Sequence, residues 1–437
     1  MKEETMAARG RIITRTACVA ILTLAWGLRD KAYGFAGGTG EPNDPYQIAT
    51  IEDLIAVGSS NELLSKHYVL VNDLDLDPNL PGGRVFDTAL IAADSDDKAN
   101  THGGNPFSGV FDGQGYTIQN LHISGRDGYD AGLFGMLSGV VKDLNLQDVR
   151  ISGSPCGAIA GLNHRGVILC CSVTGQVSGA EDVGGVVGFL WDAHMMDCWA
   201  KVQITGDKST GGLVGEGSGG TLIQCRAQIQ IEGGTNVGGL IGGGIGGDYQ
   251  IIECRADGTV VGVSNVGGLA GGMWTGTILR CAVDCEVVAE QTAGGLMGDG
   301  DAAFGVWIMD SHVHGSVAGS LIGGLLGTTA DARVMNCYAA CEMIPVTSDD
   351  GQAAVVGGLF GDTTAYRVPL VIDSFWDTEV SGTSLSAGQG AQYPDAGLST
   401  EQMQQQETFE QAGWDFASTW TMSDGEYPVL QWELAIK

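Results

Sequence analysis

Residues 211–242 read GGLVGEGSGGTLIQCRAQIQIEGGTNVGGLIG, and this stretch decides the fold. It contains Gly-Leu-x-Gly twice, at Gly212–Gly215 and at Gly239–Gly242, and another glycine precedes each copy. Between the copies lie a strand-like segment that includes Cys225 and a second one at Ile229–Ile231. Because a fixed period of about 20 to 50 residues is typical of repeat architectures, the stretch predicts a solenoid.

The same pattern recurs along most of the chain. Nine copies, one of them degenerate, begin at Gly132, Ala158, Gly185, Gly212, Gly239, Gly268, Gly295, Gly324 and Gly358, so the period is nearly constant until the last copy. Each repeat holds three short strand-like segments separated by glycine-rich turns, and a strand of four or five residues spans about 13–17 Å. The sequence therefore predicts an all-β fold: a right-handed parallel β-helix with coils of about 27 residues and three strands. A helical solenoid is disfavoured because no window shows the period of an α-helix.

The repeat resembles the GLUG motif, which is named for its Gly-Leu-hydrophobic-Gly core. Asn336-Cys337-Tyr338-Ala339 matches the strand that follows the motif in that family, and the lead-in Gly37–Ile48 and the tail Gly413–Phe416 are similar as well. The resemblance covers nearly all of residues 37–437. It implies a pectin-lyase-like β-helix in a secreted or cell-surface bacterial protein, often adhesin-like, without one fixed activity.

The composition describes an acidic, glycine-rich protein with a real core. Glycine accounts for 71 of 437 residues, hydrophobic residues make up 43%, and 21 Lys and Arg stand against 52 Asp and Glu, a net charge of −31. A surface this negative repels phosphate backbones and anionic lipids. The sequence therefore predicts neither nucleic-acid binding nor electrostatic docking to membranes.

The N-terminus reads as an export signal. A basic start from Lys2 to Arg15 precedes an apolar run, Ala17–Leu28, which is too short to span a bilayer and suits the core of a signal peptide. Small residues at Gly34 and Ala36 predict cleavage after Ala36. An uncleaved signal anchor is the alternative; otherwise we expect a secreted or cell-surface protein with no membrane insertion after cleavage.

Four regions follow from these patterns. We predict a signal peptide at 1–36, an N-terminal cap with the first coils at 37–130, the repeat β-helix at 131–382 and a C-terminal cap at 383–437. Caps are expected because the open strand edges of a solenoid would otherwise pair with other chains. Within them, the sequence predicts a helix capped by Thr50 that runs to Val57, a short helix over Thr400–Phe409 and a final strand over Tyr427–Trp432.

The cysteines recur with the repeat. At a fixed place after the second glycine of the motif, or slightly later where a coil has an insertion, stand Cys171, Cys198, Cys225, Cys254, Cys281 and Cys337, with Ser311 and Ser374 in two further coils. One cysteine per coil predicts a structural ladder of small buried side chains, about 4.8 Å apart. A disulfide between adjacent coils remains the alternative.

Aligning the coils on this ladder tests for paired carboxylates, which polysaccharide-degrading enzymes use. The residues before the ladder position are Cys170, Asp197, Gln224, Glu253, Arg280, Asp310, Asn336 and Asp373, and those after it are Ser172, Trp199, Arg226, Arg255, Ala282, His312, Tyr338 and Phe375. Neither column places two acids on neighbouring coils, so no catalytic residue is predicted, although other faces of the coils are not tested by this alignment.

Two groups of residues are candidate metal ligands. Asp310, His312 and His314 alternate, which would point all three to one side of a strand, with Asp284 beside His314 on the preceding coil. Asp73, Asp75 and Asp77 also alternate and could bind calcium, but Pro78 and Arg84 stand where an EF-hand loop needs Gly and Glu. A solvated polar face is the plainer interpretation of both groups, so the sequence predicts no cofactor, with calcium as the alternative.

These patterns favour a non-catalytic function. We expect a monomeric surface or matrix protein that adheres to, or binds, a polysaccharide or a cell-surface protein. A polysaccharide lyase or glycoside hydrolase built on a β-helix is one alternative. A structural spacer that acts with a partner protein is another.

Overall fold

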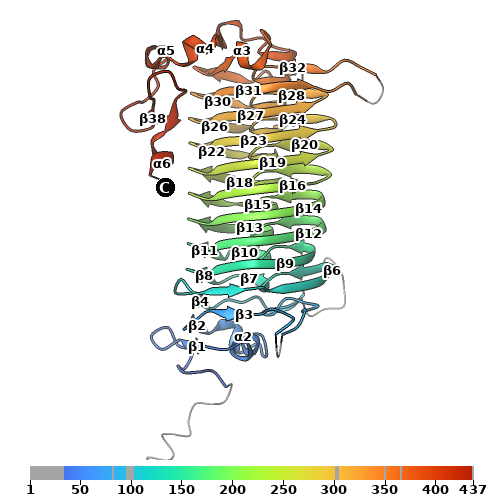
Figure 1. The fold of residues 1–437 in the computed structure, drawn as a ribbon, viewed down its shortest axis with the longest axis vertical. Coiled ribbons are helices and arrows are strands. Elements are labelled where there is room, and N and C mark those ends of the chain that lie inside the picture. The colour runs from blue at the N-terminus through green and yellow to red at the C-terminus, as the bar shows by residue number, and fades with distance from the viewer. Residues whose placement is uncertain are drawn as a thin grey trace, which may run out of the picture.

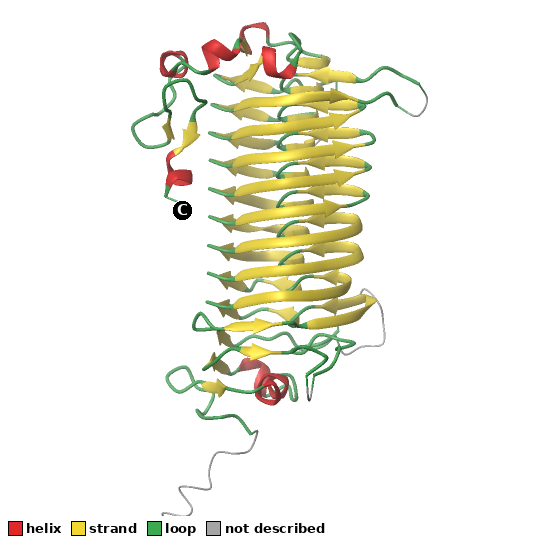
Figure 2. Ribbon diagram, viewed as in Figure 1, coloured by secondary structure: helices red, strands yellow, loops and turns green. Residues whose placement is uncertain are grey.

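The chain winds into a parallel β-solenoid of about 10 turns (Figure 1). The computed structural model describes residues 34–80, 83–94, 103–300, 305–348, 351–364 and 367–435, so the predicted signal peptide lies almost wholly outside the described residues. Strands account for 55% of the chain and helices for 8%. Figure 2 shows that the helices lie at the two ends of the solenoid and along one side near the C-terminus.

Two long parallel sheets form the walls of the solenoid, and each coil contributes to both. Sheet I consists of β1 (Tyr46–Ile48), β2 (His67–Leu70), β4 (Val110–Asp112), β7 (Phe134–Leu137), β8 (Val140–Lys142), β10 (Ala160–His164), β11 (Val167–Leu169), β13 (Val187–Met196), β15 (Val214–Ile223), β18 (Ile241–Ile252), β21 (Ala270–Met273), β22 (Gly276–Leu279), β25 (Met297–Gly300), β26 (Val306–Met309), β29 (Leu326–Thr329), β30 (Arg333–Met335), β33 (Phe360–Asp362), β34 (Leu370–Ile372) and β36 (Ala387–Gln389).

Sheet II consists of β3 (Leu74–Asp75), β5 (Thr117–Gln119), β6 (His122–Ala131), β9 (Asn145–Cys156), β12 (Ser172–Gly184), β14 (Trp199–Gly211), β16 (Arg226–Glu232), β17 (Thr235–Gly238), β19 (Arg255–Gly262), β20 (Ser264–Gly267), β23 (Ala282–Ala289), β24 (Thr292–Gly294), β27 (His312–Gly319), β28 (Leu321–Gly323), β31 (Tyr338–Pro345), β32 (Val355–Gly357), β35 (Phe375–Asp377) and β37 (Gly397–Leu398). Its strands lie on the near side in Figure 1. The segment after the ladder cysteine is longer than expected, and from β16 onward a turn divides it into two strands in most coils.

The coils stack in the register that the repeat predicts. Trp199 pairs with Arg226, Arg226 with Arg255, Ala282 with His312, and His312 with Tyr338. Inward-facing apolar side chains from both sheets form one continuous core along the axis, and the leucine of each motif is fully buried, as at Leu213 and Leu269. The prediction of a stacked β-solenoid is therefore confirmed.

Glycine pairs form the corner at which sheet II turns into sheet I. At Gly267, a Cβ atom would lie 2.0 Å from the carbonyl oxygen of Ala270 and 2.7 Å from both the amide of Gly298 and the Cα of Met297. All three neighbours are backbone atoms, so this corner has no room for a side chain.

The ladder cysteines form the opposite corner, where sheet I turns into sheet II. The strand predicted around Cys225 is wrong in one respect: β15 ends at Ile223, and Cys225 lies in the turn that follows. The residue before each ladder position adopts the left-handed conformation, with φ between 45° and 54° at Asp143, Cys170, Asp197, Gln224, Glu253, Arg280, Asp310, Asn336 and Asp373. Asp and Asn account for five of these nine positions, because they tolerate this conformation best after glycine.

The N-terminal cap contains a helix at the predicted position. Helix α2 (Ile51–Val57) has Thr50 as its N-cap, whose hydroxyl accepts a hydrogen bond from the Asp53 amide while the Asp53 carboxylate accepts from the Thr50 amide. Phe35 is buried below it and stacks on Tyr46 with 4.5 Å between ring centroids. The predicted cleavage after Ala36 would remove this ring, and the cleavage site stays a prediction.

The C-terminal cap differs from its predicted form. The expected single helix over Thr400–Phe409 is two short helices, α4 (Thr400–Met403) and α5 (Gln406–Gln411), because the chain leaves helical geometry at Gln404 and Gln405. The expected final strand is only β39 (Val429–Leu430), which pairs antiparallel with β38 (Trp420–Thr421) and continues into α6 (Gln431–Leu434). Helices α3 (Thr378–Ser381), α4 and α5 lie across the end of the solenoid, whereas β38 and α6 lie beside it (Figure 1).

The C-terminal segment, residues 399–435, then folds back along the outer face of sheet II (Figure 1). Its side chains Met403, Phe409, Trp414, Trp420 and Leu430 pack with Tyr338 and Ala340 of β31 in a second apolar cluster. The longest helix in the described ranges, α2, has 7 residues, and none of the described helices could span a bilayer.

Candidate functional site

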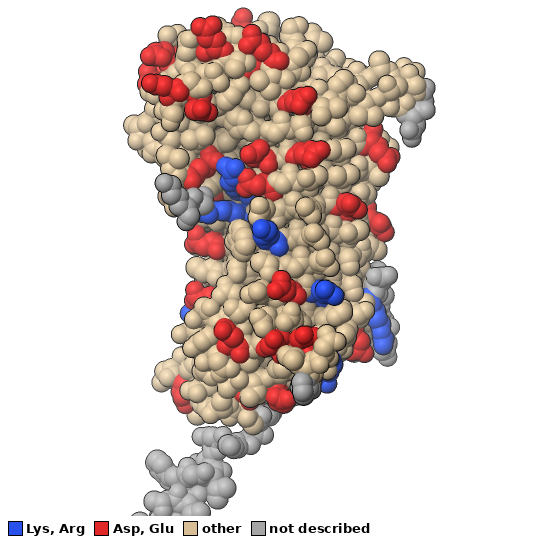
Figure 3. Space-filling view, viewed as in Figure 1, with Lys and Arg blue, Asp and Glu red and all other residues tan. Residues whose placement is uncertain are grey.

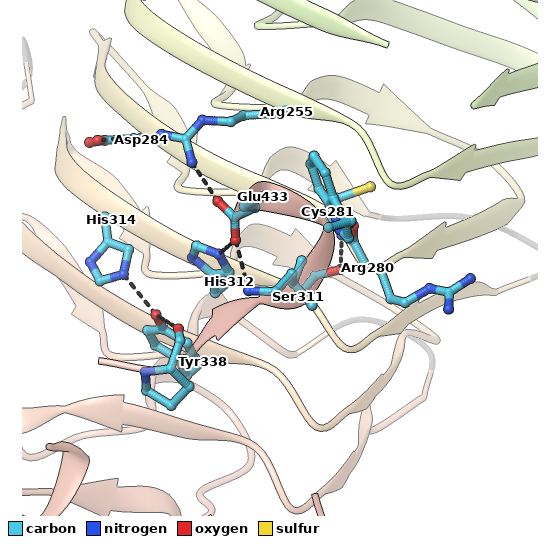
Figure 4. A network of polar contacts seen from close by, with 12 residues as sticks. Arg255, Arg280, Cys281, Asp284, Ser311, His312, His314, Tyr338 and Glu433 are labelled. Carbon is cyan, nitrogen blue, oxygen red and sulfur yellow. Dashed lines mark hydrogen bonds and ion pairs between the residues drawn. The ribbon is translucent and has the colours of Figure 1, made fainter. Parts of the chain in front are cut away.

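The histidines predicted as metal ligands lie under the C-terminal segment (Figure 4). Nε2 of His312 is 2.8 Å from the Glu433 carboxylate, and Nε2 of His314 is 2.7 Å from the hydroxyl of Tyr338. Asp310 does not join them, because it occupies the left-handed corner before β27 and accepts a hydrogen bond from Asn336. The three side chains that were expected on one side of a strand are thus divided between a corner and a covered surface.

Glu433 joins the C-terminal segment to sheet II through two partners. Besides His312, its carboxylate contacts Nη1 of Arg255 at 2.5 Å, and Arg255 also contacts Asp257. Burial alone would raise the pKa of Glu433, but the hydrogen bond and charge of His312 and the charge of Arg255 outweigh it and lower the pKa to about 2. Burial, and next the charge of His312, lower the pKa of His314 to about 3. Glu433 therefore stays ionised and His314 stays neutral at pH 7.

The three aspartates predicted as calcium ligands already accept hydrogen bonds within the first coils. The Asp75 carboxylate accepts from the side-chain amides of Gln119 and Asn120, and the Asp73 carboxylate accepts from the Thr117 amide. Asp77 accepts from Asn79. Across the described ranges, no group of three or more His, Cys, Asp or Glu side chains could hold a metal ion.

The structure contains one carboxyl pair that the alignment on the cysteine ladder does not reveal. Asp182 occupies a left-handed corner of sheet II, in the column that continues with Ser209, Asn236 and Asn265 on the next coils. Glu216 of β15 is buried beside it and accepts a hydrogen bond of 2.5 Å from the Ser209 hydroxyl. Burial, and next the Glu216 carboxyl, raise the pKa of Asp182 to about 8, so the pair shares a proton at neutral pH.

This pair makes folding stability depend on pH. Because the folded-state pKa of Asp182 is raised, its contribution to stability is complete below the unfolded pKa of about 4 and is lost as the pH rises towards 8. We expect Asp182→Asn, which places the residue of the next coils at this corner, to remove that loss and raise the free energy of unfolding at pH 8.5 by about 1–3 kcal/mol relative to the native chain. Urea unfolding at pH 5 and pH 8.5 measures both values.

The exposed Asp207, on the neighbouring coil, supplies the control. Asp207→Asn removes one negative charge without touching the buried pair and should leave the difference between the two pH values unchanged. Equal pH dependence in the native chain and Asp182→Asn would show that the pair does not share a proton.

The ladder cysteines are buried at one corner of successive coils and are all free thiols, as are the other cysteines in the described ranges. Each ladder thiol donates to the carbonyl two residues before it, as Cys198 does to Met196 at 3.3 Å. Ser311 and Ser374 keep this bond at 2.8 and 2.9 Å. Serine therefore replaces cysteine here because both are small donors that can satisfy the same carbonyl.

A groove of about 1300 Å³ crosses the outer face of sheet II. It extends from the loop Asp77–Asn79, beside the first coils, to Thr259 in β19. Gly175 and Gly258 line it, and their φ angles of 140° and 126° are strained for other residues. A Cβ at Gly175 would also lie 2.2 Å from the carbonyl oxygen of Val149, so this position has no room for a side chain.

Side-chain amides line the middle of the groove. Gln176, Gln203 and Gln230 occupy one outward column, and each glutamine donates to the next at 2.9 and 3.0 Å. Lys201 and Gln228 lie in the neighbouring column, and Trp199, with 39% of its surface exposed, stands two residues before Lys201 on β14. Figure 3 shows this face, with Lys and Arg side chains gathered across its middle part.

The sequence predicts which polar residues recur on this face, but it does not predict the shape of the groove. Aligning the coils places Trp199, Arg226 and Arg255 in one column, and the three glutamines recur once in each coil. The alignment does not show that the C-terminal segment covers one end of this face and leaves the other end open.

No family model matches the chain, so the resemblance to GLUG proteins stays a prediction. The chain is 33% identical over 439 residues to a Gly-rich membrane protein of Evansella cellulosilytica, with 90% of this chain and 45% of that protein covered. It is 34% identical over 159 residues to Halomucin of Haloquadratum walsbyi, with 35% of this chain and 2% of Halomucin covered. The chain thus spans less than half the length of either relative.

Two solved structures are similar to it. An immunoglobulin A1 protease-like protein from Bacteroides ovatus matches with a TM-score of 0.41 and 16% identity, over 91% of this chain and 95% of that one. An IgA1 protease matches with a TM-score of 0.31 and 16% identity, over 75% of this chain and 21% of that one. Both scores are below 0.5, and the fold assignment rests on the strand pairing described above.

Proposed function

We propose that this chain is a non-catalytic protein of the cell surface that binds carbohydrate along the groove on sheet II. The observation that carries the proposal is the groove itself, a long concave surface lined by side-chain amides from successive coils. Along the column Gln176 donates, Gln203 donates and accepts, and Gln230 accepts, which leaves further donors and acceptors for sugar hydroxyls. The exposed ring of Trp199 adds an apolar face at the edge.

The length of the groove favours a polymer over a single sugar. The groove crosses five strands on successive coils, β9, β12, β14, β16 and β19. Its first and last strands are therefore four coil steps apart. At about 4.8 Å for each step, this corresponds to about 19 Å along the solenoid axis. An extended chain of several sugar units would occupy this length.

The names of the relatives support a location at the cell surface. One is called Halomucin and the other a Gly-rich membrane protein. The predicted export signal at residues 1–36 agrees with that location. The Asp182 and Glu216 carboxyls are not among the residues that line the groove, so the proposal assigns them no part in binding.

Binding in the groove should depend on Trp199 and Gln203. We expect the double variant Trp199→Ala/Gln203→Ala to lose about 10-fold or more in affinity for a retained polysaccharide, because it removes the aromatic face and breaks the amide ladder. The measurement is retention of residues 37–437 on a panel of neutral and acidic polysaccharides, with mass spectrometry of the polymers afterwards.

Trp274 provides the matched control, since it is 56% exposed and lies between β21 and β22 on sheet I. Trp274→Ala should retain native affinity, and an equal loss in this variant would place binding elsewhere. Shortened polymer chains would contradict the non-catalytic function and favour a polysaccharide-degrading enzyme. Retention on no polymer would favour a spacer that acts with a partner protein.

A further inference from the structure

We propose that the groove selects acidic polysaccharides and that the basic row, Arg150, Lys201 and Arg226, binds their anionic groups. The inference rests on the proposed carbohydrate binding and names the class of polymer. Arg150 on β9 and Lys201 on β14 line the groove, and Arg226 on β16 lies two residues before the groove residue Gln228.

The basic row is unpaired in a chain that has acids in excess. Outside residues 1–36 the sequence contains 15 Lys and Arg against 49 Asp and Glu. Ion pairs with carboxylates are formed by Lys66, Lys142, Arg165, Lys208, Arg255, Arg280, Arg333 and Arg367. In contrast, no side-chain hydrogen bond or ion pair joins Arg150, Lys201 or Arg226 to any other described residue. Among the described residues, two unpaired cations in the groove and a third beside it are therefore not explained by the folded chain itself.

Arg226 is the most constrained member of the row. It is only partly exposed, and its Nε atom is fully buried without a hydrogen-bond partner. It pairs in register with Trp199 on one side and with Arg255 on the other. Arg255 contacts the carboxylates of Asp257 and Glu433, so Arg226 is the arginine of this column that no carboxylate of a described residue contacts.

The protein itself contains a carboxylate bound in this column. Arg255, which pairs with Arg226 from the next coil, contacts the Glu433 carboxylate at 2.5 Å. This contact shows how an anionic group approaches the outer face of sheet II at that position (Figure 4). Arg226 lies one coil before Arg255 and has no such carboxylate partner among the described residues. An anionic ligand could therefore bind there in the same way.

The net negative charge of the chain does not oppose such a ligand at close range. Charges more than about 8 Å apart are largely screened at physiological ionic strength, whereas direct contacts within the groove are screened less. A hydrogen bond from a charged donor to an anionic acceptor is also stronger than one between neutral groups. The basic row can thus select for charge although the whole surface is acidic.

The test uses polymer pairs with the same sugar backbone, of which one member is acidic and the other neutral. Residues 37–437 are assayed for binding to polygalacturonate and its methyl ester, and to carboxymethyl dextran and dextran of equal length. We expect the native chain to prefer the acidic member of a pair by about 10-fold or more, and the triple variant Arg150→Gln/Lys201→Met/Arg226→Gln to lose that preference. Lys208→Met is the control, because Lys208 is also on β14 but pairs with Glu181 outside the groove.

Each outcome decides a different claim. Equal binding of acidic and neutral polymers by the native chain would overturn the charge selection and leave carbohydrate binding intact. Loss of the preference in Lys208→Met as well would assign it to net charge and overturn the role of the basic row. Binding of no polymer would overturn the proposed function and the inference with it. Unfolding curves that match the native chain exclude misfolding of the variants.

Discussion

Gly267→Ala should prevent stable folding of the central coils. The new methyl group would lie 2.0 Å from the carbonyl oxygen of Ala270 and 2.7 Å from backbone atoms of the next coil. Neighbouring coils hold this corner on both sides, so the backbone has no direction in which to move. We expect a loss of about 3 kcal/mol or more in the free energy of unfolding, seen as a lower midpoint in thermal unfolding or as loss of soluble protein.

Gly272→Ala is the control for this variant on the same coil. Its Cβ would lie 3.4 Å from the nearest atom, the carbonyl oxygen of Asp299, at the lower limit of ordinary contact. We expect little change in the unfolding midpoint there. If the two variants were equally stable, close backbone packing would not be the reason for the paired glycines.

Glu433→Ala should release the C-terminal segment from sheet II. The substitution leaves the buried His312 ring without its only hydrogen-bond partner among the described residues, since Nδ1 of His312 is already unpaired. It also removes one carboxylate from Arg255. Breaking a buried ion pair costs about 3–5 kcal/mol. We expect rapid proteolysis within residues 399–435 and a change in tryptophan fluorescence from Trp414, Trp420 and Trp432.

The exposed Glu426 on the same segment supplies the control, and Glu426→Ala should stay resistant to protease. Acid should act on the native chain in the same direction. The depressed pKa of His314 stabilises the folded chain above pH 6.5, and this contribution is lost as the pH falls towards 3. The depressed pKa of Glu433 adds a contribution that is lost as the pH falls from about 4.5 to 2. A segment that stays protected at pH 3, or in Glu433→Ala, would show that its apolar contacts alone hold it.

Much of the fold could be predicted because the repeat fixes both the coil and the register. The nearly constant period places Ala282, His312 and Tyr338 in one column, and the structure pairs them in that order. The corner at Cys225 was harder to predict, because an apolar run that ends in cysteine has the same pattern whether its last residue is in a strand or in a turn. The left-handed residue before it, here Gln224, gives no clear signal in a single sequence.

The candidate site could be predicted only in part. The chain segment that covers His312 comes from Glu433, 121 residues further along, and no local pattern links the two. The Asp182–Glu216 pair was missed because its members occupy different columns of successive coils, on either side of a glycine corner. The groove also depends on how the loop Asp77–Asn79 packs beside the coils, which the repeat does not define.

The reactivity of the buried thiols can also be used to detect local unfolding of the solenoid. Nine of the ten described cysteines are buried, and Cys170 is exposed, so an alkylating reagent should modify Cys170 first in the folded protein. Most coils between Cys171 and Cys337 have a ladder thiol, and each thiol becomes reactive only when its own corner opens. Peptide mapping after brief labelling would therefore report, coil by coil along the axis, where the solenoid begins to unwind.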